Sequence, residues 1–388
     1  MEIRERAQKQ SQYVIDLRRE FHMNPEPSWK EFRTSGRVKE ELDKIGVPYI
    51  TVSKTGVVAT IKGNSEGKTV ALRADMDALE ITEINDVPYK SQNPGIMHAC
   101  GHDGHTAMLL GAARILNEIK DEIKGTVKLI FQPAEETTQG AKTMLEELNI
   151  MEDVDGILGI HLWSGVEVGK VSVEAGPRMA SADIIKITVT GKSGHGSMPH
   201  QAIDAVVAAS AIVMDLQSIV SREISPLESA VVSIGSFHSG TRFNIIANEA
   251  VLIGTTRSFN PAIRDQFPSM IERIAKNTAA SYRAEAELEY TWGTPPTTND
   301  PECSKIAAKS VEKILGKDGI VELEKTTGAE DLSYFFQKAP GVIAFVGIRN
   351  EEKEACFAHH HERFNMDEDA LETGTALYAQ FAVDFLNN

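Results

Sequence analysis

The sequence has 388 residues, which is more than one compact core usually holds, so two domains are expected. Its formal net charge is −16, which argues against nucleic acid and anionic membranes as partners because both bind basic surfaces. The apolar fraction of 41% is ordinary for a globular protein with a sizeable core.

Cysteine usage and the N-terminus bear on the cellular compartment. Cys100, Cys303 and Cys356 are too few, and odd in number, for a disulfide framework, which favours a reducing compartment. The N-terminal segment is charged throughout and lacks the apolar core of a signal peptide. No apolar run approaches the length of a membrane span. We therefore expect a cytoplasmic protein with no membrane partner.

The larger part of the chain has the pattern of an α/β domain. Apolar residues at helical spacing predict a helix over residues 3–23, and "HTAMLLGAARILNEI" (105–119) predicts another. Continuous apolar runs predict the strands "TVALRADMD" (69–77), "GTVKLIFQPAEE" (125–136), "GILGIHLW" (156–163) and "GVIAFVG" (341–347). Such strands separated by helices indicate a mixed, mostly parallel sheet covered on both faces.

Residues 181–293 have a different pattern, with alternating strands and two helices. Strands are predicted at 183–191, 228–237, 249–259 and 283–290, and helices at 204–220 and 261–282. Asn260 and Pro261 suit a helix start, and Pro268 a kink. The order β-α-β-β-α-β predicts a ferredoxin-like α+β domain. It is inserted into a catalytic domain of residues 1–180 and 294–388, with 291–300 as a linker.

The segment "MHACGHDGHTA" (97–107) is the first candidate site. Cys100 and His102 are thiolate and imidazole ligands one residue apart, in a loop closed by Gly101 and Gly104. Taken alone, the segment also suits a polar loop in which Asp103 caps the following helix. A Cys-x-x-Cys redox site is excluded because no second cysteine is nearby.

Further polar groups follow the predicted strands. Glu135 and Glu136 are costly to bury unless paired or bound to metal, although an exposed acidic loop end is common. His161 follows an apolar run, and "FAHHHERF" holds three histidines; a core residue and an exposed turn are the alternatives. The carboxyl ends of parallel strands share one sheet edge, so we expect these groups to converge. Together they suit a two-metal hydrolase with a carboxylate base.

Segments throughout the chain resemble the aminoacylase and carboxypeptidase group of dinuclear metallopeptidases. More narrowly, they resemble its amidohydrolase branch, which includes hippurate hydrolases and auxin–amino acid conjugate hydrolases. The resemblance rests on the order and spacing of "RADMDAL", "MHACGHDGH", "FQPAEE", "GIHLW", "GKSGHGSMPH", "FNIIANEA", "GTTRSF", "GAEDLSYF" and "HHERF".

The resemblance implies two divalent metal ions per chain, Mn or Zn, with Co or Ni as further options. Cys100 takes the place of a bridging carboxylate, Glu135 is the general base and acid, and Asp77 is a supporting carboxylate. The motif "HHERF" departs from the branch, which usually has a small residue and proline after the ligand. Aligning its "RF" places the ligand at the middle histidine of the run. The implied metal ligands are Cys100, His102, Glu136, His161 and His360.

For the inserted domain the resemblance implies a lid that also forms a homodimer. His195 would polarise the substrate carbonyl in the partner's site, while Asn244 and Arg257 would hold the substrate backbone and carboxylate. A Gly-rich loop histidine, a turn residue and a surface cation are the corresponding alternatives. Arginine suits a bidentate carboxylate clamp.

The predicted activity is hydrolysis of the amide bond of N-acyl amino acids or similar small N-acyl compounds. Alternatives in the same group are a carboxypeptidase or dipeptidase on short peptides and an N-acetyl-diaminopimelate deacetylase. A non-catalytic metal or ligand binder is a different class, which the presence of Glu135 disfavours. A structural zinc domain is disfavoured because such sites have closed ligand sets without a spare base.

Overall fold

The computed structural model describes residues 2–388 and divides into two compact units. The first unit comprises the chain up to Arg178, Thr298–Lys325 and Asp331–Asn388. The second comprises Met179–Thr297 and Thr326–Glu330. The return of residues 326–330 to the second unit was not foreseen from the sequence. It is held by the backbone N–H of Ala180, which donates to the carbonyls of Thr326 and Gly328.

A seven-stranded mixed sheet forms the centre of the first unit, in the order β1-β2-β4-β3-β5-β15-β6. The four inner strands β4, β3, β5 and β15 are parallel, and antiparallel strands flank them on both sides. This confirms the predicted α/β class with a parallel centre. The strands are β1 (Tyr49–Val52), β2 (Gly56–Lys62), β3 (Ser65–Asp75), β4 (Lys124–Gln132), β5 (Gly156–Glu167), β6 (Val171–Ser172) and β15 (Gly341–Arg349).

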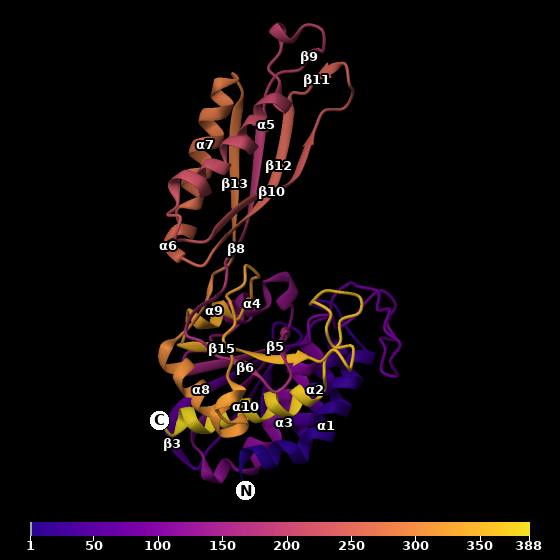
Figure 1. Ribbon diagram of the computed structural model, residues 1–388, viewed down its shortest axis with the longest axis vertical. Coiled ribbons are helices and arrows are strands. Elements are labelled where there is room, and N and C mark those ends of the chain that lie inside the picture. The colour runs from indigo at the N-terminus through magenta and orange to yellow at the C-terminus, as the bar shows by residue number, and fades with distance from the viewer. Residues whose placement is uncertain (1) are drawn as a thin grey trace. The chain divides into compact units, whose positions relative to one another are not determined.

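Helices cover both faces of this sheet. Figure 1 shows α3 and α10 on one side of β5 and β15, with α4 and α9 on the other. The core is built from the apolar faces of the strands and of α1, α3 and α10, and α3 is buried along most of its length. The helices are α1 (Ile3–Met23), α2 (Phe32–Lys44), α3 (His102–Glu118), α4 (Gly140–Glu147), α8 (Pro301–Leu315), α9 (Ser333–Phe336) and α10 (Asp369–Leu386).

His161 lies within β5, which continues to Glu167, beyond the predicted end of this strand at Trp163. The register explains the difference. β3 pairs with β5 only as far as Arg73 opposite Gly159, whereas β15 continues alongside β5 to Arg349 opposite Glu167. His161 is therefore level with the last residues of β3, where a neighbouring strand has ended and a side chain can reach the sheet edge.

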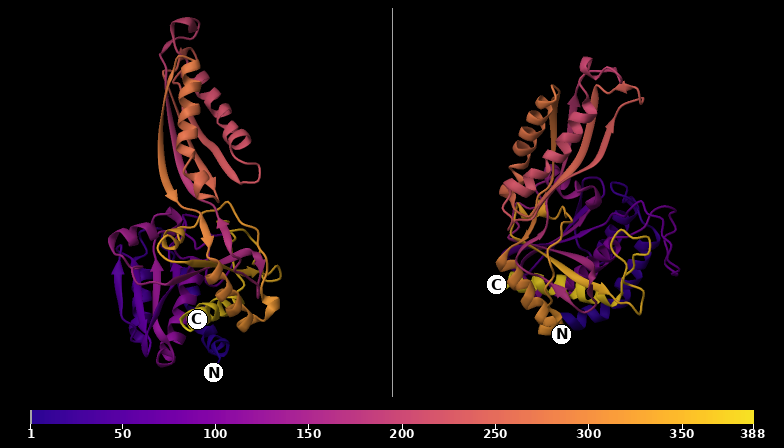
Figure 2. Two further views of the ribbon diagram at one scale, coloured as in Figure 1. Left: turned by 90° about the vertical axis from the view of Figure 1, so that its left-hand side faces the viewer. Right: turned by 45° about the horizontal axis from the view of Figure 1, so that its top comes forward.

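The second unit has the predicted ferredoxin-like topology. Its four antiparallel strands run in the order β10-β12-β8-β13, and α5 and α7 pack on one face, as Figure 2 shows. The cap at Asn260 and the break before Pro268 both occur: α6 ends at Arg264 and α7 starts at Phe267. Its elements are β8 (Ala182–Thr190), β9 (Gly194–His195), α5 (Ala205–Asp215), β10 (Ala230–Ser239), β11 (Ile245–Ile246), β12 (Glu249–Ser258), α6 (Pro261–Arg264), α7 (Phe267–Ser281) and β13 (Glu285–Thr294).

Two expectations from the sequence need correction. The proposed linker 291–300 is partly strand, because β13 extends to Thr294 and β14 (Thr297–Asn299) pairs with β7 (Gly176–Met179). In addition, the helical segment Ala205–Glu223 is long and apolar enough, by length and composition alone, to cross a membrane. The statement that no run approaches this length was therefore wrong. In the structure α5 ends at Asp215, and its inner face joins the core of the second unit.

A buried ion pair holds the second unit together, and its removal should destabilise that unit. Asp183 is fully buried and accepts hydrogen bonds from Arg264 Nε and Nη2, at 2.9 and 2.7 Å, and from Gly293 N at 2.9 Å. Asp183→Ala leaves the Arg264 cation buried without its carboxylate. We expect a loss of about 3–5 kcal/mol in the free energy of unfolding.

The measurement is urea unfolding in a Trp29→Phe, Trp163→Phe background, in which Trp292 of the second unit is the only tryptophan. The control is Asp265→Ala at an exposed position, which should change the free energy of unfolding by less than about 0.5 kcal/mol. Equal effects of the two substitutions would contradict the assignment.

Candidate metal centre

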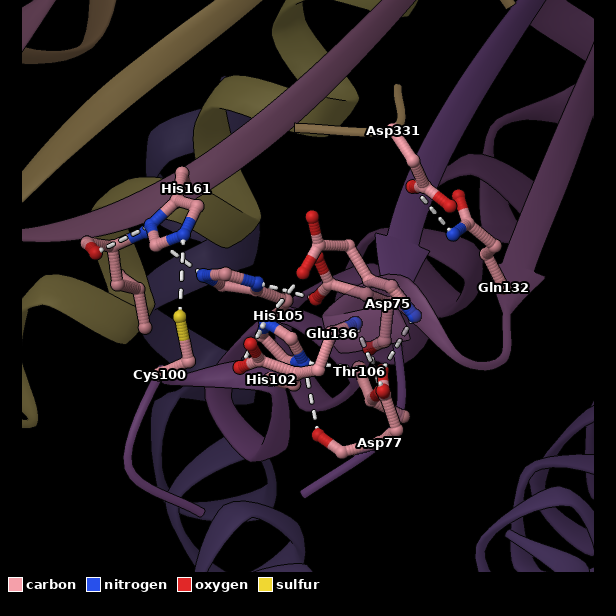
Figure 3. A network of polar contacts seen from close by, with 12 residues as sticks. Asp75, Asp77, Cys100, His102, His105, Thr106, Gln132, Glu136, His161 and Asp331 are labelled. Carbon is pink, nitrogen blue, oxygen red and sulfur yellow. Dashed lines mark hydrogen bonds and ion pairs between the residues drawn. The ribbon is translucent and has the colours of Figure 1, made fainter. Parts of the chain in front are cut away.

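The candidate metal ligands converge at the carboxyl ends of the parallel strands in the first unit. Gly101 adopts φ +96°, a left-handed conformation that suits glycine, and lets α3 begin directly at His102. Cys100 Sγ lies 3.6 Å from His161 Nε2. Ligand atoms of Cys100, His102 and His161 all lie within 4.8 Å of one another. Figure 3 shows these side chains turned toward one another.

A second group of potential ligands shares the cysteine. Cys100, Glu136 and His360 also place their ligand atoms within 4.8 Å of one another. Glu136 lies between the two groups, with His360 Nε2 at 3.5 Å and His102 Nε2 at 3.9 Å. Residues separated by 260 positions in the chain therefore form two overlapping sets of soft and hard ligands around one thiol.

Two buried polar atoms support a cation at this place. His102 Nε2 and Glu136 Oε1 are inaccessible to solvent and have no hydrogen-bond partner among residues 2–388. Buried polar atoms are nearly always satisfied, so an additional bound group is expected between them. Thiolate and imidazole ligands suit Zn, and the carboxylate also admits Mn. The residues present therefore fit a divalent metal.

The electrostatic environment of His102 also favours a cation at this place. Burial lowers the pKa of His102, but the neighbouring carboxylates of Asp75 and Asp77 outweigh this and raise it to about 10. Its Nδ1 lies 2.9 Å from the backbone carbonyl of Asp77, which leaves Nε2 directed at Glu136. Positive charge is thus strongly favoured at this nitrogen, whether as a proton or as a metal ion.

A layer of buried groups orients the ligands. Asp75 accepts hydrogen bonds from His105 Nδ1 at 2.6 Å and Arg73 Nη1 at 2.7 Å. The backbone N–H of Leu162 donates to His105 Nε2 at 2.8 Å, which defines the His105 tautomer. Since Leu162 follows His161 in β5, this chain of contacts links the end of β3 to the position of a candidate metal ligand.

Asp77 holds the turn that carries the adjacent glutamates. The backbone N–H groups of Glu135 and Glu136 donate to its two carboxylate oxygens at 3.0 and 3.1 Å. The turn is a short 3-10 helix, Glu135–Thr137, and Glu135 is buried beside the ligands. The supporting carboxylate proposed from the sequence thus contacts both glutamates through their backbone.

The structure separates the three consecutive histidines. His360 has φ +64°, and its N–H donates to Ala99 O, which brings its ring to Glu136. His359 Nε2 instead lies 2.9 Å from Leu162 O, and the His361 ring stacks on Phe357. The structure therefore places the middle histidine among the candidate ligands.

The remaining site residues from the sequence lie in the second unit. His195 is exposed on β9 and pairs with Ile245 of β11, next to Asn244, whose buried Oδ1 has no hydrogen-bond partner among residues 2–388. Arg257 is on β12 and lines a cavity of about 180 Å³ together with Val231 and Phe259. Within the described residues its guanidinium makes no hydrogen bond or ion pair, and burial lowers its pKa.

Comparison with known proteins identifies the family. The model of the peptidase family M20/M25/M40 matches residues 71–384. The chain belongs to the M20 peptidase family.

Similar proteins within the family are named for different activities. Thermostable carboxypeptidase 2 of Saccharolobus solfataricus is 43% identical, covering 97% of this chain and 96% of its own. N-acetylcysteine deacetylase of Bacillus subtilis is 39% identical, covering 95% and 96%. The crystal structure of the Bacillus subtilis YXEP protein, described as a dinuclear metal-binding peptidase of this family, has a TM-score of 0.88 at 34% identity and covers 98% and 99% of the two chains. This M20 protein is a metal-dependent hydrolase of amide bonds.

Several supporting residues of this M20 hydrolase were not identified from the sequence. Arg73 is fully buried and also donates to Asp331 Oδ1 at 3.0 Å, across 258 positions of sequence. The sequence placed Arg73 only within a strand and Asp331 only within the segment "GAEDLSYF", and it identified Asp75 as an acidic group at a strand end but not as the partner of His105. A charged residue within an otherwise apolar strand was the available signal, because such a charge needs a buried partner.

The contact between Asp75 and His105 should strengthen metal binding, and its loss should therefore lower the measured affinity for zinc. Asp75→Asn preserves the side-chain volume but removes the charge that orients His105 and faces His102. Loss of such a supporting group typically weakens metal binding about 10–100-fold. The measurement is competition for zinc with a chromophoric chelator. The matched control is Asp155→Asn, whose carboxylate accepts Thr69 N near the other end of β3. Equal affinity in the wild type and Asp75→Asn would contradict the assigned role.

Proposed function

We propose that this hydrolase cleaves the amide bond of N-acyl amino acids or similar small N-acyl compounds, as a homodimer with two divalent ions per chain. The observation that carries the proposal is a buried carboxylate, Glu135, directly beside Glu136 in the cluster of candidate ligands. One carboxylate can hold metal while its neighbour remains available as a base. A site that only binds metal has no use for this second group.

The proposed ligands are Cys100, His102, Glu136, His161 and His360. Divalent ions bound there, Mn or Zn in our proposal and Co or Ni as options, would act as Lewis acids toward the carbonyl and lower the pKa of a nucleophilic water. Asp77 fixes the backbone of both glutamates, so Glu135 keeps its place when the cluster binds metal. The mechanism therefore needs little rearrangement of the first unit.

Glu135 has the principal role in proton transfer. It takes the proton of the attacking water and then delivers it to the nitrogen of the departing amine. His195 donates a hydrogen bond to the developing oxyanion, which is the position where a donor is most effective. Asn244 and Arg257 hold the substrate, and Arg257 binds its carboxylate in the bidentate manner that guanidinium favours.

The relatives leave two substrate classes in consideration. A deacetylase removes the acyl group from an amino acid, whereas a carboxypeptidase removes the last amino acid of a peptide. Both substrates present a carboxylate next to the cleaved amide, so Arg257 suits either. We favour the N-acyl amino acid, and a carboxypeptidase on short peptides is the second candidate. N-acetyl-diaminopimelate is a specific variant of the first class.

The internal geometry of the second unit supports a shared active site. Arg257 pairs with Val231 at one end of β12, whereas β9 and β11 lie beyond the other end, at Glu249 (Figure 1). Eight residues of strand span about 26 Å, at roughly 3.3 Å per residue. This exceeds the length of an N-acyl amino acid. This separation supports the proposal that the His195 and Arg257 side chains acting on one substrate come from different chains.

Exposed apolar residues on α5 offer a surface for dimer formation. Val206, Val207 and Met214 are 40%, 47% and 70% exposed on the outer face of this helix. We propose that the second unit, the inserted domain, is both the lid and the dimerisation domain. We also propose a cytoplasmic location, which the absence of a disulfide between Cys100, Cys303 and Cys356 supports.

The substrate class and the base can be tested together. Metal-loaded protein is offered N-acetyl and N-benzoyl amino acids and dipeptides, and amine release is measured. We expect the highest kcat/KM for an N-acyl amino acid. Glu135→Gln should lower kcat by about 10²–10⁴-fold with full metal content, because it removes only the base. Glu136→Gln should lose metal, as measured by elemental analysis. Near-normal turnover of fully loaded Glu135→Gln would place the base elsewhere.

Sharing of His195 between chains can be tested by complementation. His195→Ala and Glu135→Gln chains, each inactive, are dissociated, mixed and reassociated. One site of the hybrid dimer then has both an intact base and the partner's intact histidine. Activity should appear on mixing. Each hybrid dimer should have up to about half the activity of a wild-type dimer because one of two sites is complete, and since random reassociation makes about half of the dimers hybrid, the mixture should reach up to about one quarter. Hybrid dimers seen by native mass spectrometry without activity would show that the histidine acts within its own chain or not at all.

A further inference from the structure

The loop between α1 and α2 places a buried carboxylate directly behind the turn of the two glutamates. Glu31 is 0% exposed. Its Oε1 accepts the backbone N–H groups of Trp29 at 2.8 Å and Ala134 at 3.0 Å, and its Oε2 accepts Thr55 Oγ1 at 2.8 Å. A residue 103 positions away in sequence thus binds the amide immediately before Glu135.

Three consecutive backbone amides of the turn are therefore held by two buried carboxylates. Ala134 N donates to Glu31, and the amides of Glu135 and Glu136 donate to Asp77. Ala134 has φ +54°, a left-handed conformation that is unfavourable for a residue with a side chain. Such a backbone persists only where its surroundings determine it, and here the acceptor behind Ala134 provides that constraint.

The loop that carries Glu31 is itself fixed to the end of β3. Ser28 Oγ donates to Asp77 Oδ2 at 2.6 Å, and Ala78 N donates to Glu26 O at 2.9 Å. The same loop thus supports Asp77 as well as Ala134. Glu31 belongs to this loop and Asp77 is hydrogen-bonded to it, so both carboxylates that hold the turn depend on the loop.

Helix capping does not account for the burial of Glu31. Glu31 precedes the first residue of α2, but its side chain makes no capping hydrogen bond. Glu26 performs that function, because its carboxylate accepts the N–H groups of Arg33 and Thr34. The Glu31 side chain is directed away from the helix that it precedes, toward the turn of β4.

We propose that Glu31 is a positioning residue for hydrolysis: through the amide of Ala134 it fixes the turn that presents Glu135 as base and Glu136 as metal ligand. This inference rests on the proposed function. A displacement of about 1 Å at such a position can cost on the order of 10²-fold in rate. Glu31 contacts no candidate ligand and acts only through the backbone of the turn.

The test compares two substitutions at Glu31. In Glu31→Gln the amide oxygen can accept Trp29 N and Ala134 N, and the amide nitrogen can donate to Thr55 Oγ1. Glu31→Met has a similar length but leaves Ala134 N without an acceptor. The matched control is Glu41→Met on α2, which removes another buried carboxylate whose partners are Tyr13, Arg37 and Lys44. If Glu31→Met does not fold, Glu31→Asp, shorter by one methylene, replaces it.

The first readout is hydrogen exchange in metal-free protein, followed by mass spectrometry on peptides covering residues 132–139. Glu31→Met should exchange about tenfold or more faster in this segment, because the Ala134 hydrogen bond is lost. Glu31→Gln and Glu41→Met should exchange like the wild type. Unchanged exchange in Glu31→Met, or equal acceleration in Glu41→Met, would overturn the proposal.

The second readout is kinetic and uses the metal-loaded enzyme. Glu31→Met should lower kcat about 10–100-fold with KM within about threefold, and Glu31→Gln should restore it. In a fully metal-loaded Glu135→Gln background, Glu31→Met should lower residual turnover by no more than about threefold, because with the metal in place most of its effect passes through the missing base. Full additivity would overturn the inference. If the wild type hydrolysed no substrate of the panel, the proposed function would fail, while the exchange comparison would still decide the role of Glu31.

Discussion

The burial of two carboxylates at the end of β3 is the constraint on which the metal centre depends. Asp75 and Asp77 are shielded from water, and negative charge in such a place must be compensated. Burial raises the pKa of Asp75, but His102, Arg73 and His105 lower it well below its usual range. The carboxylates remain charged, and the neighbouring side chains and backbone amides supply positive charge or N–H donors to them. The ligand side chains and the turn of the glutamates occupy positions that this requirement sets.

The different lengths of neighbouring strands determine where the candidate ligands lie around these carboxylates. The pairing of β3 with β5 ends at Arg73 and Gly159 whereas β5 and β15 continue together, so His161 lies level with the last residue of β3. α3 begins at the same edge, because Gly101 can adopt the left-handed backbone that precedes His102. His105, one turn further along α3, then bridges Asp75 to the backbone of Leu162. The imidazole ring of His105 thus connects the start of α3, the end of β3 and the continuing strand β5.

The sequence allowed prediction of the parts of the molecule that depend on local pattern. Apolar runs and helical spacing predicted α1, α3 and the four parallel strands of the first unit, and the order of elements predicted the ferredoxin-like unit. The contacts that hold the site could not be read in this way. Glu31 and Asp331 reach Ala134 and Arg73 across 103 and 258 positions, and no local signal reports such a distance. The extension of β5 beyond His161 likewise depends on pairing with β15 rather than on its own residues.

The local charge at Arg257 in the second unit bears on the proposed substrate more directly than the overall charge does. The protein carries a net charge of −16, yet Arg257 is half-buried without a carboxylate partner among the described residues. Burying a guanidinium costs free energy, and arginine stays charged even when its pKa falls. The half-buried guanidinium of Arg257 therefore favours binding of an anionic group from outside the chain. In the proposed function the carboxylate of the substrate is this group, which a simple amide lacks, so the proposal assigns discrimination between an acyl group and a peptide to residues that face the other side of the cleaved bond.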